Sequence, residues 1–455
     1  MKTLLKGGTV VSGSGLHRAD VLLEGKKIVS VGEGLSCADG QTVDVTGMLL
    51  FPGFIDAHTH FDLDVCNTTT ADDFVSGTRS AICGGTTTVV DFACPNKGES
   101  LAYGLDLWHK KADGRCLCDY GFHMTIDDWN DQIRAELPEM FRAGVSSFKM
   151  YLTYPAMMIG DGEIYSVLKA LKPYGGIAGV HCENSGVIDA MIAEAKVAGK
   201  TEPASHPATR PDAAEAEAIS RLLRLAEMAD TSVVVVHLSS KAGLEEIRAA
   251  RKRGRIVYVE TCPQYLLLED SRYAQEYAEA AKFVCAPPLR KQADAEALWE
   301  ALANGEIQTV STDHCSFTLD QKDAGRGDFT KIPGGLPGVE TRGILLYSEG
   351  VAKGRITPET MCRVLCENPA KLYGMGDRKG FIAEGYDGDI VVLDPEAVQT
   401  LTAKALHSKA GYTPFEGMAV KGAIRQVYLR GQLAAEQGEP TGVTGQFIPR
   451  GINSL

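Results

Sequence analysis

Two histidines, His58 and His60, end an apolar run that begins at residue 53. Because side chains alternate along a strand, both imidazoles would lie on the same face of it. Two imidazoles on one face at a strand end suit a metal ion, although two buried, hydrogen-bonded histidines would give the same pattern. The pair alone favours neither interpretation.

Three further polar residues also end apolar runs. His181 and His237 each follow a run of small or β-branched apolar residues, and Asp313 follows the run that begins at residue 307. Enzymes built on parallel barrels place their active sites at the carboxyl ends of the strands. Four histidines and one aspartate in such positions therefore predict a metal centre rather than five separate structural residues.

Lys149 lies inside another apolar run, residues 146–152. A lone ammonium buried among apolar side chains is costly unless it is paired or neutral. The lysine could be salt-bridged. Alternatively, the neutral amine could add CO2 to form a carbamate, whose two oxygens bridge two cations as a carboxylate does.

The runs that carry these residues alternate with amphipathic stretches, among them residues 213–228 and 242–253. Thr70 is the expected cap of the first helix, with Asp72 and Asp73 in its first turn and Gly84 at its end. We expect eight strands, over residues 53–60, 86–94, 120–126, 146–152, 176–181, 232–237, 256–260 and 307–312. This order predicts an α/β fold, a (β/α)8 TIM-like barrel with insertions. A doubly wound sheet is the alternative, but no glycine-rich phosphate-binding motif follows any strand.

Both ends of the chain carry strand patterns without helices between them. A hairpin is predicted over residues 21–31, and further strands over 389–393 and 426–429. The simplest assembly packs both ends into one small β-sandwich beside the barrel. The predicted domains are therefore residues 1–52 and 376–455 for the sandwich and 53–375 for the barrel, with an arm from about residue 442.

The composition is that of an ordinary globular protein, with 44% hydrophobic and 23% charged residues among 455. A net charge of −13 argues against a nucleic-acid partner. We expect a cytoplasmic protein without a membrane partner, because no apolar run reaches the ~20 residues of a membrane helix and no signal peptide is recognisable. The 12 cysteines should be reduced, and the pairs Cys116–Cys118 and Cys362–Cys366 should be small buried residues rather than zinc ligands.

Several motifs resemble those of the dihydropyrimidinase and hydantoinase family, the cyclic-amide branch of the amidohydrolases. They are GFIDAHTHFD at 53–62, SFKMY at 147–151, HCEN at 181–184, ETCPQY at 260–265, APPLR at 286–290, TDHC at 312–315 and YTPFEG at 412–417. The similarity extends from the N-terminal strands to about residue 435. Within this family, the sequence most resembles the bacterial D-hydantoinases and phenylhydantoinases.

The resemblance implies two divalent metal ions, with zinc expected first and manganese, iron and cobalt also compatible. The implied ligands are His58, His60 and Asp313 for the more buried ion, His181 and His237 for the second, and a carboxylated Lys149 and a hydroxide for both. The bridging hydroxide would attack the ring amide. Asp313 would pass the proton to the leaving nitrogen, Tyr154 would stabilise the oxyanion, and the ring would open to an N-carbamoyl amino acid.

The resemblance also places residues around the substrate. The family usually has Ser where Ala286 stands and Asn where Gly334 stands, and both positions contact the ring through backbone groups. Val65, Tyr151 and Met158 would line the pocket for the exocyclic substituent. They suit a hydrogen, alkyl or aryl group better than the ureido group of allantoin, so dihydropyrimidines and 5-substituted hydantoins both fit.

Two other functions are compatible with this fold. One is an allantoinase-type hydrolysis of a cyclic ureide. The other is a non-catalytic interaction protein, which is disfavoured because every implied metal-ligand position holds a ligand residue. The resemblance implies a homotetramer, and the C-terminal arm is a candidate for reaching a neighbouring subunit.

Overall fold

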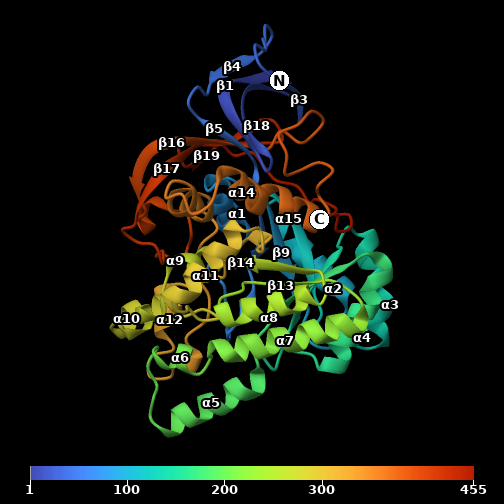
Figure 1. The fold of residues 1–455 in the computed structure, drawn as a ribbon, viewed down its shortest axis with the longest axis vertical. Helices are drawn as coiled ribbons and strands as arrows, with labels where there is room; N and C mark the ends of the chain where they lie inside the picture. Colours follow the sequence, from blue (N-terminus) through green and yellow to red (C-terminus); the bar gives the residue numbers. More distant parts are fainter. Residues whose placement is uncertain (1) are drawn as a thin grey trace.

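Eight parallel strands form a barrel in the computed structural model, which describes residues 2–455 (Figure 1). The strands are β6 (Phe54–Thr59), β9 (Thr86–Ala93), β10 (Asp119–Thr125), β11 (Ser147–Tyr151), β12 (Ile177–His181), β13 (Val233–Val235), β14 (Val257–Thr261) and β15 (Thr309–Val310). They are neighbours in chain order. The barrel nearly closes between its first and last strands, where the His60 N–H donates to the His314 carbonyl at 2.8 Å. The predicted (β/α)8 barrel is confirmed.

Helices follow the barrel strands and cover them from outside. They are α1 (Phe74–Cys83), α2 (Leu101–Ala112), α3 (Asp131–Arg142), α4 (Asp161–Leu171), α7 (Asp212–Ala229), α8 (Lys241–Lys252), α11 (Gln292–Ala303) and, after β15, α13 (Arg342–Leu345), α14 (Pro358–Cys362) and α15 (Asn368–Leu372). The two amphipathic helices expected over residues 213–228 and 242–253 are confirmed as α7 and α8.

The first helix begins later than predicted. Asp73 caps α1, with its carboxylate accepting a hydrogen bond from the Ser76 N–H at 2.9 Å. The prediction of Thr70 as the cap is wrong because a short hairpin, β7 (Asp64–Val65) and β8 (Thr68–Thr69), occupies the chain just before it. The Thr70 hydroxyl instead accepts from the Leu63 N–H at 3.0 Å.

Insertions lengthen the connections after three strands. They contain α5 (Ser185–Val197) and α6 (Ser205–Ala208) after β12, α9 (Pro263–Leu267) and α10 (Tyr277–Ala280) after β14, and α12 (Leu319–Asp323) after β15. Helix α5 lies at the end of the molecule opposite the N-terminal strands (Figure 1). Among the helices of residues 2–455, none has the length and hydropathy needed to cross a membrane.

The small β-sandwich predicted from both chain ends is confirmed as a separate β-domain, and its nine strands belong to one hydrogen-bonded sheet. Its strands are β1 (Lys2–Ser12), β2 (Gly15–Glu24), β3 (Lys27–Gly32), β4 (Gln41–Asp44), β5 (Leu49–Pro52), β16 (Ile390–Thr400), β17 (Ala419–Leu429), β18 (Gln432–Glu436) and β19 (Glu439–Pro440). The two halves join where β5 pairs antiparallel with β16. The predicted hairpin is confirmed as β2–β3. The domain limits near residues 52 and 375 stay predictions.

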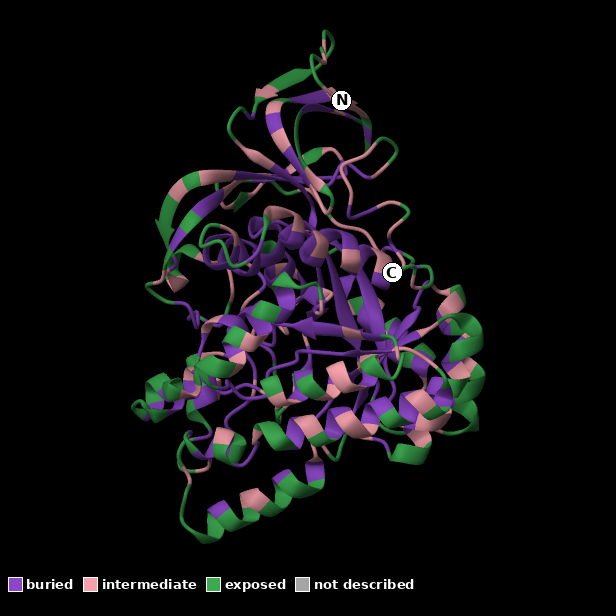
Figure 2. Ribbon diagram, in the orientation of Figure 1, coloured by how far each residue is buried: buried purple, intermediate pink, exposed green. Residues whose placement is uncertain are grey.

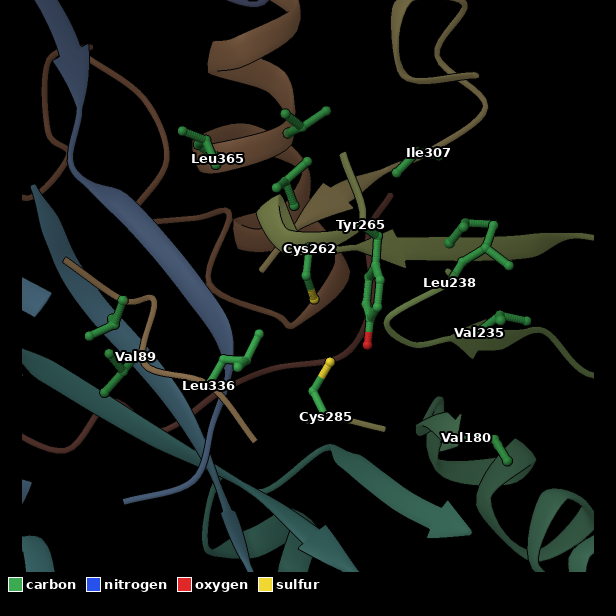
Figure 3. Close-up of a cluster of buried hydrophobic side chains, with 14 of the residues drawn as sticks. Val89, Val180, Val235, Leu238, Cys262, Tyr265, Cys285, Ile307, Leu336 and Leu365 are labelled. Carbon is green, nitrogen blue, oxygen red and sulfur yellow. The ribbon is translucent and has the colours of Figure 1, made fainter. Parts of the chain in front are cut away.

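The main core surrounds the barrel strands, which are buried along most of their length (Figure 2). In one part of it, Cys262, Tyr265 and Cys285 lie among aliphatic side chains (Figure 3). All 12 cysteines are free, and those at 116, 118, 362 and 366 are buried as predicted.

The C-terminal segment packs against its own barrel. The Ile448 N–H donates to the Tyr120 carbonyl at 2.7 Å, and the buried Arg450 donates to Ser147 Oγ at 2.7 Å. Tyr120 and Ser147 lie at the amino ends of β10 and β11. Residues 445–450 therefore cover the amino end of the barrel, the end opposite the strand termini that carry the predicted ligands. The arm from about residue 442 stays a prediction.

Candidate metal centre and active site

The predicted metal ligands meet at the carboxyl end of the barrel. All of them line one cavity of about 400 Å³, and they are His58, His60, Lys149, His181, His237 and Asp313. His58, Lys149 and His181 lie in β6, β11 and β12. His60, His237 and Asp313 follow β6, β13 and β15 within three residues. Because parallel strands of a barrel end at one rim, residues far apart in sequence meet here.

His58, His60 and Asp313 form the tightest group. One oxygen of Asp313, Oδ1, lies 3.2 Å from His58 Nε2 and 3.1 Å from His60 Nε2. Burial raises the pKa of Asp313, but His58 and His60 lower it to about 2, so this group is a carboxylate. His58 Nε2 is buried and, within residues 2–455, has no hydrogen-bond partner. A buried nitrogen lone pair beside a carboxylate is a donor set that a divalent cation would satisfy.

His181 and His237 lie beside this group. Their ring centroids are 4.5 Å apart, and that of His237 is 5.4 Å from that of His58. His181 Nε2 is engaged by Glu183 at 2.7 Å, which leaves Nδ1 for a ligand. His237 Nδ1 is buried and finds no partner in the part of the chain described. These two residues thus fit a second metal ion next to the first.

Lys149 is 1% exposed and faces the same cavity. Its Nζ lies 5.1 Å from the ring centroids of both Phe92 and Tyr151, and no carboxylate of residues 2–455 forms an ion pair with it. Burial lowers the pKa of Lys149 to about 8, although Asp313 and Glu260 act in the opposite direction. A lowered pKa enlarges the fraction of neutral amine, the form that adds CO2. The surroundings therefore fit the carbamate better than the salt-bridged alternative.

Three candidate site residues have left-handed backbone conformations. The φ angles are +70° at Tyr154, +39° at His237 and +53° at Asp313. Each such conformation costs of order 1–3 kcal/mol in a residue other than glycine, and this kind of strain clusters at functional sites. The strain supports a functional role for these three positions independently of their side-chain chemistry.

Glu260 supports two of the histidines, a role that the sequence reasoning did not assign. Its Oε1 accepts from His58 Nδ1 at 2.6 Å and from the His237 N–H at 3.2 Å. The first bond fixes the tautomer of His58, so that the Nε2 lone pair faces Asp313. Burial raises the pKa of Glu260, and the hydrogen bonds that it accepts and the Lys149 ammonium act in the opposite direction. The only signal in the sequence was that Glu260, like the ligands, lies near the end of an apolar run.

Glu183 and Arg210 form a second support that was also missed. Glu183 accepts from His181 and from Arg210 Nη1. Burial raises the pKa of Glu183, but Arg210 and His181 lower it to about 2, so the carboxylate stays ionised. The Arg210 guanidinium also lies 5.5 Å from the ring centroid of Tyr154. Arg210 thus contacts both Glu183, which holds the predicted metal ligand His181, and Tyr154, which is predicted to contact substrate.

Most of the predicted substrate contacts line the cavity. They are Val65, Tyr151, Tyr154, Ala286 and Gly334. Met158 does not line it, and its neighbour Met157 does. Further apolar residues also line the cavity: Leu63, Ile192, Phe329 and Ile332. A cavity lined by both apolar side chains and a cluster of histidines can hold a small ring that carries an apolar substituent.

Residues 49–434 match the model of the amidohydrolase family. The chain is 42% identical to a D-hydantoinase of Geobacillus stearothermophilus over 455 residues, which cover 99% of this chain and 97% of that protein. It is 41% identical to a D-phenylhydantoinase of Escherichia coli over 451 residues, covering 98% and 97%. A crystal structure of dihydropyrimidinase from Brevibacillus agri, 41% identical, superimposes with a TM-score of 0.98 over 100% of both chains. An L-hydantoinase from Arthrobacter aurescens, 30% identical, gives a TM-score of 0.90 over 98% of this chain and 99% of that one.

Proposed function

This chain belongs to the amidohydrolase family, and on that premise we propose that it is a metal-dependent hydrolase of cyclic amides. The proposed reaction opens the ring of a 5-substituted hydantoin or a dihydropyrimidine to an N-carbamoyl amino acid. The observation that carries the proposal is the convergence of four histidines, Lys149 and Asp313 on one cavity. Relatives over the full length that are named hydantoinases add to it.

The cavity residues divide into two sets of metal ligands. His58, His60 and Asp313 would hold one divalent cation, and His181 and His237 the other, with a carboxylated Lys149 between them. Zinc suits imidazole and carboxylate donors. When bound, such a pair of ions acidifies water and polarises a carbonyl group. Glu260 and Glu183 orient His58 and His181 for this purpose, since each accepts a hydrogen bond from one ring nitrogen and directs the other into the cavity.

Asp313 and Tyr154 would act on the reacting atoms. As a water oxygen adds to the ring carbonyl carbon, the Asp313 carboxylate accepts its proton and then donates it to the ring nitrogen when the C–N bond breaks. The Tyr154 hydroxyl donates a hydrogen bond to the developing oxyanion. Burial raises the pKa of Tyr154, so its hydroxyl keeps the proton that this role needs.

The apolar residues that line the cavity favour a ring with an alkyl or aryl substituent. Leu63, Val65 and Ile332 offer no hydrogen bond to the ureido group of allantoin. Contacts of this kind discriminate by only about 1–3 kcal/mol per methylene, so an unsubstituted dihydropyrimidine also fits. We propose 5-substituted hydantoins as the first substrate class and dihydropyrimidines as the second, the latter because a dihydropyrimidinase is among the similar structures.

Ring-opening rates on a matched panel test the proposal. The panel contains dihydrouracil, hydantoin, 5-phenylhydantoin, allantoin and dihydroorotate, and the enzyme is produced with zinc and bicarbonate. We expect the highest ring-opening rate with 5-phenylhydantoin. If dihydrouracil is opened fastest, the protein is a dihydropyrimidinase with a tolerant pocket. If allantoin is opened fastest, the assigned preference for an apolar substituent is wrong, and no turnover at all would overturn the proposal. The homotetramer and the cytoplasmic location stay predictions.

A further inference from the structure

The family resemblance implies that the backbone at Ala286 and Gly334 contacts the ring, and the peptide groups at these two positions share an arrangement. Ala286 and Gly334 both line the cavity, and neither N–H donates to a nitrogen or oxygen of residues 2–455. The carbonyl of each of these peptide groups belongs to the preceding residue, and a buried side chain holds it. His206 Nε2 donates to the Cys285 carbonyl at 2.7 Å, and Lys322 Nζ donates to the Pro333 carbonyl at 2.7 Å.

Lys322 holds two loops together. It is 1% exposed, and its Nζ also donates to the carbonyls of Val284 at 2.8 Å and of Gly335 at 2.9 Å. No carboxylate of the described chain pairs with it, so the three carbonyls are its polar environment. The Gly335 N–H donates to the Val284 carbonyl at 3.0 Å and joins the same loops directly. One ammonium therefore fixes the segment that carries Ala286 against the segment that carries Gly334.

His206 acts on the other peptide as a neutral donor. It lies in α6, is buried, and lines the cavity. Burial lowers the pKa of His206 to about 3, so at neutral pH the ring is uncharged, and the bond to Cys285 requires the proton on Nε2. The bond therefore persists without an ion pair.

The N–H of a trans peptide points away from its own C=O, so a donor bound to the C=O leaves the N–H directed to the opposite side. Here, the opposite side is the cavity. In line with this, the backbone N–H of Gly334 lies beside the Cys66 thiol, another residue of the cavity wall. A hydrogen bond accepted by the C=O also polarises the peptide, which makes its N–H a stronger donor.

We propose that Lys322 and His206 are positioning residues, which orient and strengthen the N–H groups of Gly334 and Ala286 for a carbonyl oxygen of the bound ring. This inference rests on the proposed function, because it takes a cyclic amide as the ligand. Neither side chain is a predicted metal ligand. Lys322 is not among the residues that line the cavity, and the Nε2 of His206 is engaged by the Cys285 carbonyl. Their loss should therefore weaken ring binding without removing metal.

The test compares Lys322→Met with Lys322→Gln. Methionine fills similar volume without a donor, whereas glutamine keeps a neutral donor. We expect Lys322→Met to raise KM by about tenfold, the size of one weakened hydrogen bond, with kcat within about threefold of wild type. Lys322→Gln should recover part of the KM. Lys331→Met is the matched control, since Lys331 lies on the same segment with a 72% exposed side chain, and it should leave KM unchanged.

A second pair of variants tests the peptide group between Cys285 and Ala286, which His206 holds. This pair also tests the proposal if Lys322→Met fails to fold. His206→Leu should raise KM in the same way, and His206→Gln should restore it in part. Bound zinc, measured by mass spectrometry, should stay at the wild-type level in all variants. An unchanged KM in folded variants, or a loss of zinc with the activity, would overturn the positioning role. Absence of ring opening in the wild-type enzyme would overturn the proposed function instead.

Discussion

Replacing Glu260 by glutamine should weaken metal binding without removing a single predicted ligand. The carboxylate accepts hydrogen bonds from His58 Nδ1 at 2.6 Å and from the His237 N–H at 3.2 Å. A glutamine oxygen in the place of Oε1 can accept both bonds, but it carries no charge. The NH2 group would then replace Oε2, which has no hydrogen-bond partner in residues 2–455.

The expected size of the effect follows from these two bonds. A hydrogen bond to an ionised group contributes about 1.5–3 kcal/mol, and one between neutral groups about 1 kcal/mol. Loss of the charge should therefore cost about 1–2 kcal/mol at His58, which corresponds to roughly a fivefold to thirtyfold loss of zinc affinity. Changes in groups that hold a metal-bound histidine typically cost about 10–100-fold in affinity, so this estimate overlaps the expected range.

Competition for zinc against a chromophoric chelator measures the effect, with thermal unfolding as the test of the fold. Glu215→Gln is the matched control. Glu215 is also a buried glutamate and accepts from the Ser239 N–H at 2.9 Å and from Ser239 Oγ at 2.7 Å, without contacting a histidine. Both variants should unfold at a lower temperature, but only Glu260→Gln should lose zinc affinity. If Glu260→Gln binds zinc within threefold of wild type, Glu260 does not orient the metal site.

Three further predictions concern single side chains. Asp313→Ala should lower kcat by at least a hundredfold in steady-state ring opening, and a loss of less than tenfold, about 1.4 kcal/mol, would contradict its role in proton transfer. Lys149→Ala should lose both zinc and activity, and short carboxylic acids should restore part of each; full zinc retention would contradict the carbamate. In Asp72→Asn, the melting temperature should fall less steeply than in wild type as the pH is lowered. Burial raises the pKa of Asp72, but hydrogen bonds from His314 at 3.0 Å and from the Lys409 N–H at 2.9 Å hold it far below its ordinary value. A lowered folded-state pKa gives stability that is present above the unfolded value of about 3.9 and is lost as the pH falls below it. An Asp72→Asn profile parallel to that of wild type between about pH 5 and 3 would contradict this assignment.

The barrel and the polar residues that meet at its rim could be predicted because their signals are local. A buried parallel strand appears as an apolar run, and a ligand appears as the polar residue that ends the run. The topology then brings these ends together without any knowledge of loop structure. His58, His181 and Asp313 were therefore recognisable although their contacts connect distant parts of the chain.

Loops gave less reliable predictions. Thr70 and Asp73 are both good helix caps by residue type, and the hairpin β7–β8 decides between them. The choice between Met157 and Met158 depends on a turn at Tyr154, whose carbonyl accepts from both methionine N–H groups at 2.8 Å. With Tyr154 in a left-handed conformation, strand alternation no longer determines which side chain faces the cavity.

The residues that support the site could not be predicted for a different reason. Glu260 lies 202 positions from His58 in sequence and meets it only when the barrel closes. Lys322 lies in a short helix with exposed neighbours, and its sequence resembles that of an ordinary surface turn. The proposed role of Lys322 depends on the three carbonyls that surround its ammonium. These carbonyls are backbone groups, so the residue types in the sequence do not reveal them. A metal ligand must be one of a few residue types, whereas a group that holds a ligand or a peptide in place is defined by its contacts. Sequence patterns can therefore identify the atoms that would bind metal, but only the folded structure identifies those that orient them.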